Sequence, residues 1–307
     1  MKVVPLAAES MGVRSMATFV EVDGTGILID PGATLAPSRF NLPPADEEWE
    51  ELRRANDRIS AYAKRAAIVF VSHYHDDHFR REPVTYAGRR VLLKDARRMI
   101  QGAQAKRALD LGSVLAPCAK VASADGIVQK EMGFTLEVSA PLPHGVEGTT
   151  LGFVLALTVV DHAQRERFVF ASDVQGPLSS VAAAYLTRQR PTLVYLSGPP
   201  SYIEYELGEA AIARGIENLH GLIAATGCRV IMDHHALRDG RWAERFARLF
   251  ETGRVVTAAG FIGHGETVLE TRRRELWSHA RRPAAKVSAA PPRMPRERKI
   301  MKGGYRE

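Results

Sequence analysis

Residues 69–79 read VFVSHYHDDHF, which crowds three histidines and two aspartates into six positions. They follow a continuous apolar run at residues 67–72 that is typical of a buried strand, so the cluster stands at the C-terminal end of that strand. Such polar groups are costly to desolvate, and a tight group of them behind a buried strand is rarely accidental. The stretch therefore predicts a metal site.

The composition is that of an ordinary soluble globular protein. The chain has 307 residues, of which 45% are hydrophobic and 25% charged, and it can bury a large core. The longest unbroken apolar run, residues 154–160, is too short for a membrane helix, which needs about 20 residues. The N-terminal residues are too polar for a signal-peptide core, and only Cys118 and Cys228 are present, which excludes a disulfide framework. We expect a cytoplasmic protein without a membrane segment.

The positive charge is concentrated at the C-terminal end. From residue 271 onward the chain has twelve Lys or Arg against three Glu, a net of +9, so the total of +7 leaves −2 for the rest. Residues 282–307 contain four prolines and no helical or alternating period, which predicts a disordered basic tail. Two interpretations stay open: a solvated end, or an electrostatic arm that holds polyanions near the body.

Strand and helix patterns alternate along the remaining chain. Helical spacing of apolar residues predicts helices at residues 46–66, 95–109 and 208–226. Apolar runs predict strands at residues 2–6, 16–22, 25–30, 67–72, 90–93, 135–139, 151–160, 167–172, 192–196 and 229–232. A later helix carries apolar residues that we expect to pack in the core, namely Trp242, Phe246, Leu249 and Phe250. This order predicts a layered α/β protein.

Four polar candidates each follow the C-terminal end of a predicted strand, where a layered α/β protein exposes its binding loops. They are His73, His144, Asp173 and His234. His73 and His75 alternate in an extended segment and so point the same way. Asp77 and His78 follow at a turn. A single zinc needs only three or four ligands, so this larger set suits two adjacent divalent ions.

Several motifs of the chain resemble those of the metallo-β-lactamase-fold hydrolases. They are HYHDDH, ILIDPG, PLPHG, FASDVQG and MDHHALRD, in that order. More narrowly, ESMGVRSMATFVE, LIDPGATLAPSRFNLPP, SDVQGP, SGPPSY and DHHALRD together resemble an uncharacterised prokaryotic branch of predicted metal-dependent hydrolases. The resemblance implies a four-layer αβ/βα sandwich with two mixed β-sheets face to face and helices outside. This hydrolase domain would span residues 1–281, and residues 282–307 would form the tail.

The resemblance also implies a role for each candidate residue. One metal would be held by His73, His75 and His144, a second by Asp77, His78 and His234, with Asp173 bridging the two. Asp30 would orient a ligand through a hydrogen bond. His234 is favoured over His235 because it stands four residues before Arg238, a spacing that resembles the superfamily's tRNA-processing nucleases. The implied cofactors are two divalent ions, with zinc expected and manganese or iron as alternatives.

A pair of divalent ions lowers the pKa of a bridging water to about 7, which predicts hydrolysis by hydroxide. Asp77 would ligate one metal and orient the nucleophile or pass a proton. His235 and Tyr202 are both candidates for protonating the leaving group, and the sequence does not choose between them. Arg14 and Arg238 flank the predicted rim, where their guanidinium groups suit phosphate or carboxylate, although ordinary salt bridges are the alternative. We expect a phosphodiester substrate, a nucleic acid or nucleotide, which would also explain the basic tail.

Three other functions stay open. Only 60 residues separate Asp173 from His234, which leaves no room for the extra domain of the superfamily's larger nucleases, so a small ester, thioester or lactone competes as substrate. The diiron oxygen reductases that resemble this fold replace the second histidine by glutamate, and His75 argues against them, but a mononuclear iron dioxygenase is not excluded. A non-catalytic nucleic-acid-binding protein is disfavoured because every expected ligand is present. The pattern does not indicate an oligomeric state.

Overall fold

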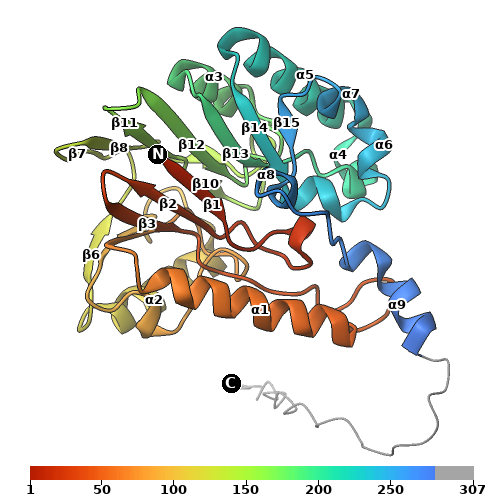
Figure 1. Ribbon diagram of the computed structural model, residues 1–307, viewed down its shortest axis with the longest axis horizontal. Helices are drawn as coiled ribbons and strands as arrows, with labels where there is room; N and C mark the ends of the chain where they lie inside the picture. The colour runs from red at the N-terminus through yellow and green to blue at the C-terminus, as the bar shows by residue number, and fades with distance from the viewer. Residues whose placement is uncertain (281–307) are drawn as a thin grey trace, which may run out of the picture.

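The computed structural model describes residues 1–280, which form two β-sheets packed face to face with helices on their outer faces (Figure 1). The strands of the first sheet are β1 (Lys2–Pro5), β2 (Thr18–Val22), β3 (Thr25–Ile29), β4 (Ile68–Val71), β5 (Arg90–Leu93) and β6 (Lys120–Ser123). They lie in sequence order, antiparallel from β1 to β3 and parallel from β3 to β6. The sheet is therefore mixed, as predicted.

The second sheet is also mixed. Its strands are β7 (Val128–Lys130), β8 (Phe134–Val138), β11 (Leu157–Asp161), β12 (Glu166–Ser172), β13 (Leu193–Ser197), β14 (Arg229–Asp233) and β15 (Val255–Val256). They lie in the order β15-β14-β13-β12-β11-β8-β7, parallel from β12 to β15 and antiparallel from β12 to β7. A separate two-stranded ribbon pairs β9 (Leu142–Pro143) with β10 (Phe153–Val154).

The helices form the two outer layers. They are α1 (Asp46–Ala63), α2 (Gly102–Leu115), α3 (Ser180–Gln189), α4 (Glu204–Leu207), α5 (Glu209–Thr226), α6 (Trp242–Arg245), α7 (Ala247–Phe250), α8 (Ala258–Phe261) and α9 (Arg273–Ala280). Short 3-10 helices are η1 (Glu9–Met11), η2 (Pro83–Thr85), η3 (Ser201–Ile203), η4 (His234–Arg238) and η5 (Glu270–Arg272). Within residues 1–280, no helix combines the length and apolarity that crossing a membrane requires.

Each outer layer is fixed by an apolar helix face. Ile59 of α1 and Leu111 of α2 pack in one buried cluster with Val69 of the first sheet. Leu186 of α3 and Leu219 of α5 belong to a second cluster on the other sheet. Figure 1 shows α1 and α2 on one side of the sandwich and α3 and α5 on the other. The four-layer αβ/βα sandwich of the metallo-β-lactamase fold is thus confirmed.

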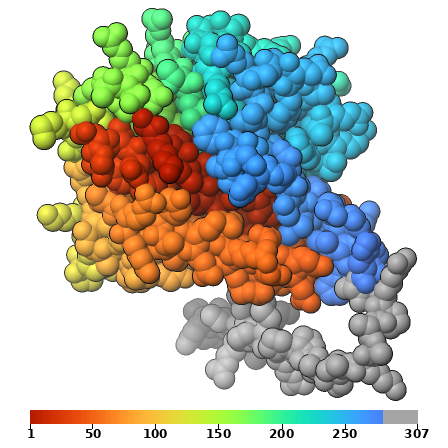
Figure 2. Space-filling model, viewed as in Figure 1, coloured from red at the N-terminus to blue at the C-terminus, as the bar shows by residue number. Residues whose placement is uncertain are grey.

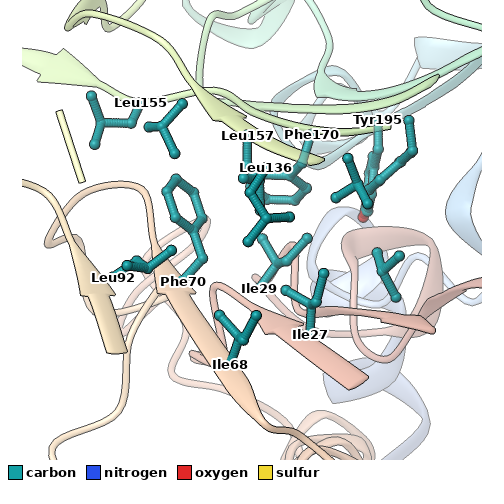
Figure 3. Close-up of a cluster of buried hydrophobic side chains, with 14 of the residues drawn as sticks. Ile27, Ile29, Ile68, Phe70, Leu92, Leu136, Leu155, Leu157, Phe170 and Tyr195 are labelled. Atoms are coloured by element: carbon teal, nitrogen blue, oxygen red, sulfur yellow. The ribbon is translucent and has the colours of Figure 1, made fainter. Parts of the chain in front are cut away.

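The main core lies between the sheets, because inward-facing residues alternate along each strand. Figure 3 shows these side chains: Ile27, Ile29, Ile68, Phe70 and Leu92 of the first sheet face Leu136, Leu155, Leu157, Phe170 and Tyr195 of the second half. Burying each large apolar side chain contributes about 1.5–3 kcal/mol. In Figure 2 the N-terminal strands fill the middle of the molecule between the two halves. The core therefore holds the two sheets together, and with them the strand ends at which the candidate residues lie.

Most predicted elements occur within a few residues of their expected bounds. The helix predicted at residues 95–109 is the exception, because α2 begins seven residues later and ends at Leu115. Asp95 accepts a hydrogen bond from the Arg97 N–H and begins a turn instead. Gln101 then caps α2 by accepting from the Ala103 and Gln104 N–H groups, so the helix starts at Gly102. Side-chain capping outweighs helical spacing here.

Three other expectations have mixed outcomes. The strand predicted at residues 151–160 is split into β10 and β11. The single late helix is two short helices, α6 and α7; Phe246 between them and Leu249 of α7 are buried in the core as expected. The basic tail predicted at residues 282–307 lies outside the described residues.

A buried ion pair attaches the last helix to the first. Arg273 at the start of α9 donates from Nε and Nη2 to the two carboxylate oxygens of Glu48 in α1, at 2.8 and 2.7 Å. Both side chains are almost completely buried, at 0% and 1% exposed. Glu48 also accepts the Ala45 N–H at the start of α1. This pair therefore fixes the helix start and the C-terminal element together.

We predict that Arg273→Ala lowers the free energy of unfolding by about 3–5 kcal/mol, because it leaves the Glu48 carboxylate buried without its partner. Urea unfolding measures the loss. Arg272→Ala is the matched control. The Arg272 side chain is 52% exposed and pairs with Glu275 at the surface. We expect the control to change stability by less than about 1 kcal/mol. Equal losses in the two variants would contradict the assignment.

Candidate metal centre

The candidate residues meet where parallel strands of both sheets end. Asp30 follows β3, His73 lies just after β4, Asp173 follows β12 and His234 follows β14. His144 comes directly after β9 in the ribbon beside the second sheet. Because the sheets pack face to face, the carboxyl ends of their strands converge on one buried edge. The predicted rim is therefore a single site.

The backbone is strained at three of these strand ends. Asp30, Ser172 and His234 have φ angles of 44°, 52° and 57°, in the left-handed region that residues other than glycine seldom adopt. Hydrogen bonds hold this conformation at His234, whose N–H donates to the Asp233 carboxylate at 2.8 Å. Asp233 also accepts the Ala258 N–H at 2.9 Å. Strain that the surrounding structure enforces in this way is typical of functional sites.

One potential ligand set contains His73, His75, His144 and Asp173, whose ligand atoms all lie within 4.8 Å of one another. His73 Nε2 is 3.1 Å from His75 Nδ1, and His144 Nε2 is 3.1 Å from Asp173 Oδ2. Three imidazoles and a carboxylate in such a cluster match the donors that zinc and similar ions prefer.

A second set contains Asp77, His78 and His234, also within 4.8 Å of one another. His234 Nε2 is 3.6 Å from Asp77 Oδ2. Asp173 reaches both sets, because its Oδ2 is 3.4 Å from His78 Nε2 and its Oδ1 is 3.5 Å from His234 Nε2. The structure thus brings together all seven residues that the sequence predicted as ligands.

Unsatisfied buried atoms indicate that these residues fit divalent metal. Among residues 1–280, His78 Nε2, His144 Nε2 and Asp173 Oδ1 are buried and have no hydrogen-bond partner. Leaving such atoms unpaired is costly, and each of them points into the cluster of ligand atoms. Metal coordination would satisfy all three.

Carboxylates outside the two sets orient the imidazoles. Asp30 Oδ2 is 2.8 Å from His78 Nδ1, as expected from its predicted supporting role, and Asp30 Oδ1 accepts the Ser72 N–H at 2.7 Å. Glu9 Oε2 is 2.7 Å from His234 Nδ1. When Nδ1 donates to a carboxylate, the Nε2 lone pair faces the centre. Glu9 was not predicted, because it lies in η1, far from every metal motif in the sequence.

Burial keeps three histidines of the site neutral. It lowers the pKa of His73 well below its usual range and that of His75 to about 4, and neighbouring histidines add to both shifts. Burial also lowers the pKa of His235, and the nearby Arg238 adds to this effect. Neutral imidazole is the form that binds a metal ion.

Carboxylates have the opposite effect on His78 and His234. Burial opposes protonation of His78, but Asp173 and Asp30 outweigh it and raise the pKa of His78 well above its usual range. Glu9 likewise outweighs burial and raises the pKa of His234 to about 9. In return, His78 and His234 hold the pKa of the Asp173 carboxyl well below its usual range, although burial opposes this. The carboxylates and these two histidines therefore stabilise each other's charged forms.

The two candidate proton donors contact each other, and His235 also contacts Asp173. His235 Nε2 is 3.3 Å from Asp173 Oδ2, and its Nδ1 is 3.0 Å from the Tyr202 hydroxyl. His235, His234 and Asp173 also offer ligand atoms that lie within 4.8 Å of one another. The preference for His234 over His235 as the metal ligand therefore stays a prediction. Asp76 is exposed and pairs with Arg81, which suits an ordinary turn residue.

The two predicted substrate arginines are both engaged by carboxylates. Arg14 donates from Nε and Nη2 to Glu270 at 2.6 and 2.7 Å. Arg238 is 5% exposed and donates to Glu9 at 2.8 Å and to Asp77 at 3.2 Å. These contacts support the alternative of structural ion pairs, and the substrate role of the two residues stays a prediction.

Sequence relatives identify the family. A UPF0282 protein of Thermococcus gammatolerans is 41% identical over 297 residues, covering 92% of this chain and 96% of its own. A UPF0282 protein of Aeropyrum pernix is 41% identical over 293 residues, covering 90% and 98%. The chain belongs to the UPF0282 family. No family model matches it.

Solved structures are similar to this UPF0282 chain at low sequence identity. Zinc-bound PqqB from Methylobacterium extorquens is 10% identical with a TM-score of 0.49, covering 87% of this chain and 99% of its own. Tm1679, a metal-dependent hydrolase of the β-lactamase superfamily, is 15% identical with a TM-score of 0.48, covering 83% and 94%.

We predict that the purified UPF0282 protein binds about two divalent ions, and that His144→Ala and His234→Ala each retain about one, because each variant removes a ligand from a different set. Elemental analysis measures the stoichiometry. His220→Ala is the control, since His220 lies on α5 and belongs to neither set. One ion per chain in the wild type would exclude a dinuclear centre.

We predict that Glu9→Gln weakens metal binding about 10–100-fold, because the amide no longer fixes His234 with a charged hydrogen bond. Competition with a chromogenic chelator measures the affinity without relying on activity. Glu21→Gln is the matched control, since Glu21 pairs with Arg65 at the surface. Unchanged affinity in Glu9→Gln would show that Glu9 has no part in orienting the ligand.

Proposed function

We propose that the protein is a metal-dependent hydrolase with a dinuclear, zinc-type centre that cleaves a phosphodiester in a nucleic acid or nucleotide. The observation that carries the proposal is the sharing of Asp173 between two ligand sets. Such a carboxylate could be shared by two divalent cations in a hydrolytic centre. The unpaired buried nitrogens of His78 and His144 add support.

The metal ions would be held by His73, His75 and His144 on one side and by Asp77, His78 and His234 on the other. When bound, such a pair would lower the pKa of a bound water to about 7 and would offset charge on the substrate. The chain positions this chemistry rigidly, because Asp30 and Glu9 hold the far nitrogens of His78 and His234. Arg238 restrains Asp77 through its guanidinium at 3.2 Å.

His235 and Tyr202 supply the proton for the leaving group. The Tyr202 hydroxyl can donate to His235 Nδ1 over 3.0 Å, which leaves the Nε2–H of His235 directed at the centre. The His235 ring lies beside Asp173, so a leaving oxygen at the centre would come within reach of this N–H. Asp77 is only 15% exposed and is braced by Arg238, which suits a ligand that orients the nucleophile.

Positive charge near the site favours a phosphodiester over a neutral substrate. The Arg39 guanidinium carbon lies 5.7 Å from the centre of the Tyr202 ring, with 23% of the side chain exposed. The sequence beyond residue 270 adds a net charge of +9. Arginine is well suited to the planar oxygen pairs of phosphate.

A substrate panel tests the proposal. With the protein loaded in turn with zinc, manganese and iron, bis(p-nitrophenyl) phosphate should be hydrolysed faster than a lactone, a thioester and a carboxylic ester. A faster ester, thioester or lactone would place the substrate in that class instead. Oxygen consumption with one iron per chain would indicate a dioxygenase. Nucleic-acid binding without turnover would indicate a non-catalytic protein.

The proton donor can be tested in the same assays. Tyr202→Phe should slow cleavage of a diester with an alkoxide leaving group more than cleavage of one with p-nitrophenolate, because a good leaving group needs little protonation. Tyr205→Phe is the matched control, since Tyr205 is 82% exposed. Equal effects on both leaving groups would remove Tyr202 from proton transfer.

A further inference from the structure

Aromatic and guanidinium groups form a continuous run that leads away from the metal centre. The rings of His235 and Tyr202 are almost parallel, at 11° with centroids 6.1 Å apart. The Arg39 guanidinium carbon lies over the Tyr202 ring at 5.7 Å and over the Phe40 ring at 5.0 Å. The Arg274 guanidinium carbon lies 4.4 Å from the centre of the Phe40 ring. We call Tyr202, Arg39, Phe40 and Arg274 the aromatic–arginine strip.

Phe40 is held in a backbone conformation that a bulky residue rarely adopts. The N–H and C=O groups of Arg39 and Leu42 exchange hydrogen bonds of 3.0 Å, which closes a two-residue turn. Within it, Phe40 and Asn41 have φ angles of 57° and 59°. Such turns favour Asn and Gly, whereas an aromatic residue in this region is an outlier. An enforced outlier of this kind points to a functional position.

Several side chains enforce the turn. Arg273 Nη1 donates to the Leu42 carbonyl at 3.1 Å, and Trp277 Nε1 donates to the Pro43 carbonyl at 2.9 Å. Arg39 Nη2 donates to the Arg238 carbonyl at 2.8 Å. The last helix and the loop behind the metal ligand His234 therefore both fix the strip. Figure 1 shows α9 close to the start of α1. A surface ordered in advance loses little entropy on binding.

The strip has a surplus of positive charge. Glu270 is the nearest carboxylate to Arg39, at 3.8 Å, but it is already engaged by both donors of Arg14. Arg274 is exposed and forms no ion pair with a carboxylate of residues 1–280. Among the described residues, the two arginines of the strip therefore carry positive charge that no carboxylate fully offsets.

Arginine stacked on an aromatic ring keeps its N–H edge free, and that edge binds phosphate oxygens in pairs. Unpaired bases can pack on the outer face of the exposed Arg274 guanidinium, because proteins that hold single strands stack bases on arginine as well as on aromatic side chains. We propose that the aromatic–arginine strip binds a single-stranded polynucleotide and leads it to the metal centre. This inference rests on the phosphodiester function proposed above and names the substrate class.

The test measures binding of the metal-loaded full chain to fluorescein-labelled, phosphorothioate-substituted oligonucleotides that resist cleavage, one ribose and one deoxyribose, by anisotropy. We expect Arg274→Ala to weaken binding roughly three- to tenfold and to reduce the slope of log affinity against log salt by about 1, as for one lost phosphate contact. Arg272→Ala is the matched control, because Arg272 lies at the end of η5, directly before α9, and pairs with Glu275. It should retain wild-type affinity.

Phe40→Ala is the second variant, and the exposed Trp49→Ala on α1 is its control. We expect only Phe40→Ala to weaken binding. Losses that are equal in each variant and its control would overturn the inference, as would tighter binding of a duplex than of either single strand. The two oligonucleotides decide between RNA and DNA. Hydrolysis of bis(p-nitrophenyl) phosphate by the wild type tests the centre itself, so failure of the strip and failure of the proposed function give different results.

Discussion

The site depends on the buried carboxylate of Asp173. A charge that is only 1% exposed cannot persist without partners, and here five histidines surround it within 3.6 Å of an oxygen atom. They come from three loops, which follow β4, β9 and β14, and from both sides of the sandwich. Their convergence is possible only because the two sheets place the carboxyl ends of β4 and β12 at one edge. The packing of the two sheets therefore determines whether the site can form.

This constraint also explains the unusual backbone. A strand that simply continued would carry its last side chains to alternate faces, and half of them would miss the centre. A left-handed residue turns the chain sharply at Asp30, Ser172 and His234, so that consecutive positions face inward. Each such residue costs of order 1–3 kcal/mol, which the hydrogen bonds to Asp233 and the buried core offset. A site with this cost is maintained by its function rather than by stability.

The sequence singles out the candidate ligands that the structure brings together, because the key ones stand just after an apolar strand and carry a distinctive residue type. His73, His144, Asp173 and His234 could all be found this way. Glu9 could not, since a glutamate before a short turn has no local signal, and its partner His234 lies 225 positions away. The error at residues 95–109 has a similar origin, because capping by Gln101 depends on hydrogen bonds that apolar spacing does not report. Contacts between distant polar groups are what the pattern of hydrophobic residues leaves undetermined.

The arginines around the site differ in how fully carboxylates neutralise them. Arg238 is 5% exposed and is shared by Glu9 and Asp77, so its charge stabilises ligands and has none to spare. Arg14 is neutralised by the bidentate carboxylate of Glu270. The same carboxylate is then too far from Arg39, at 3.8 Å, to satisfy it fully. The two arginines nearest the candidate ligands, Arg238 and Arg14, are thus neutralised by carboxylates. Arg39 lies further from the centre and is only weakly paired, so a polyanion could approach it without breaking a structural ion pair.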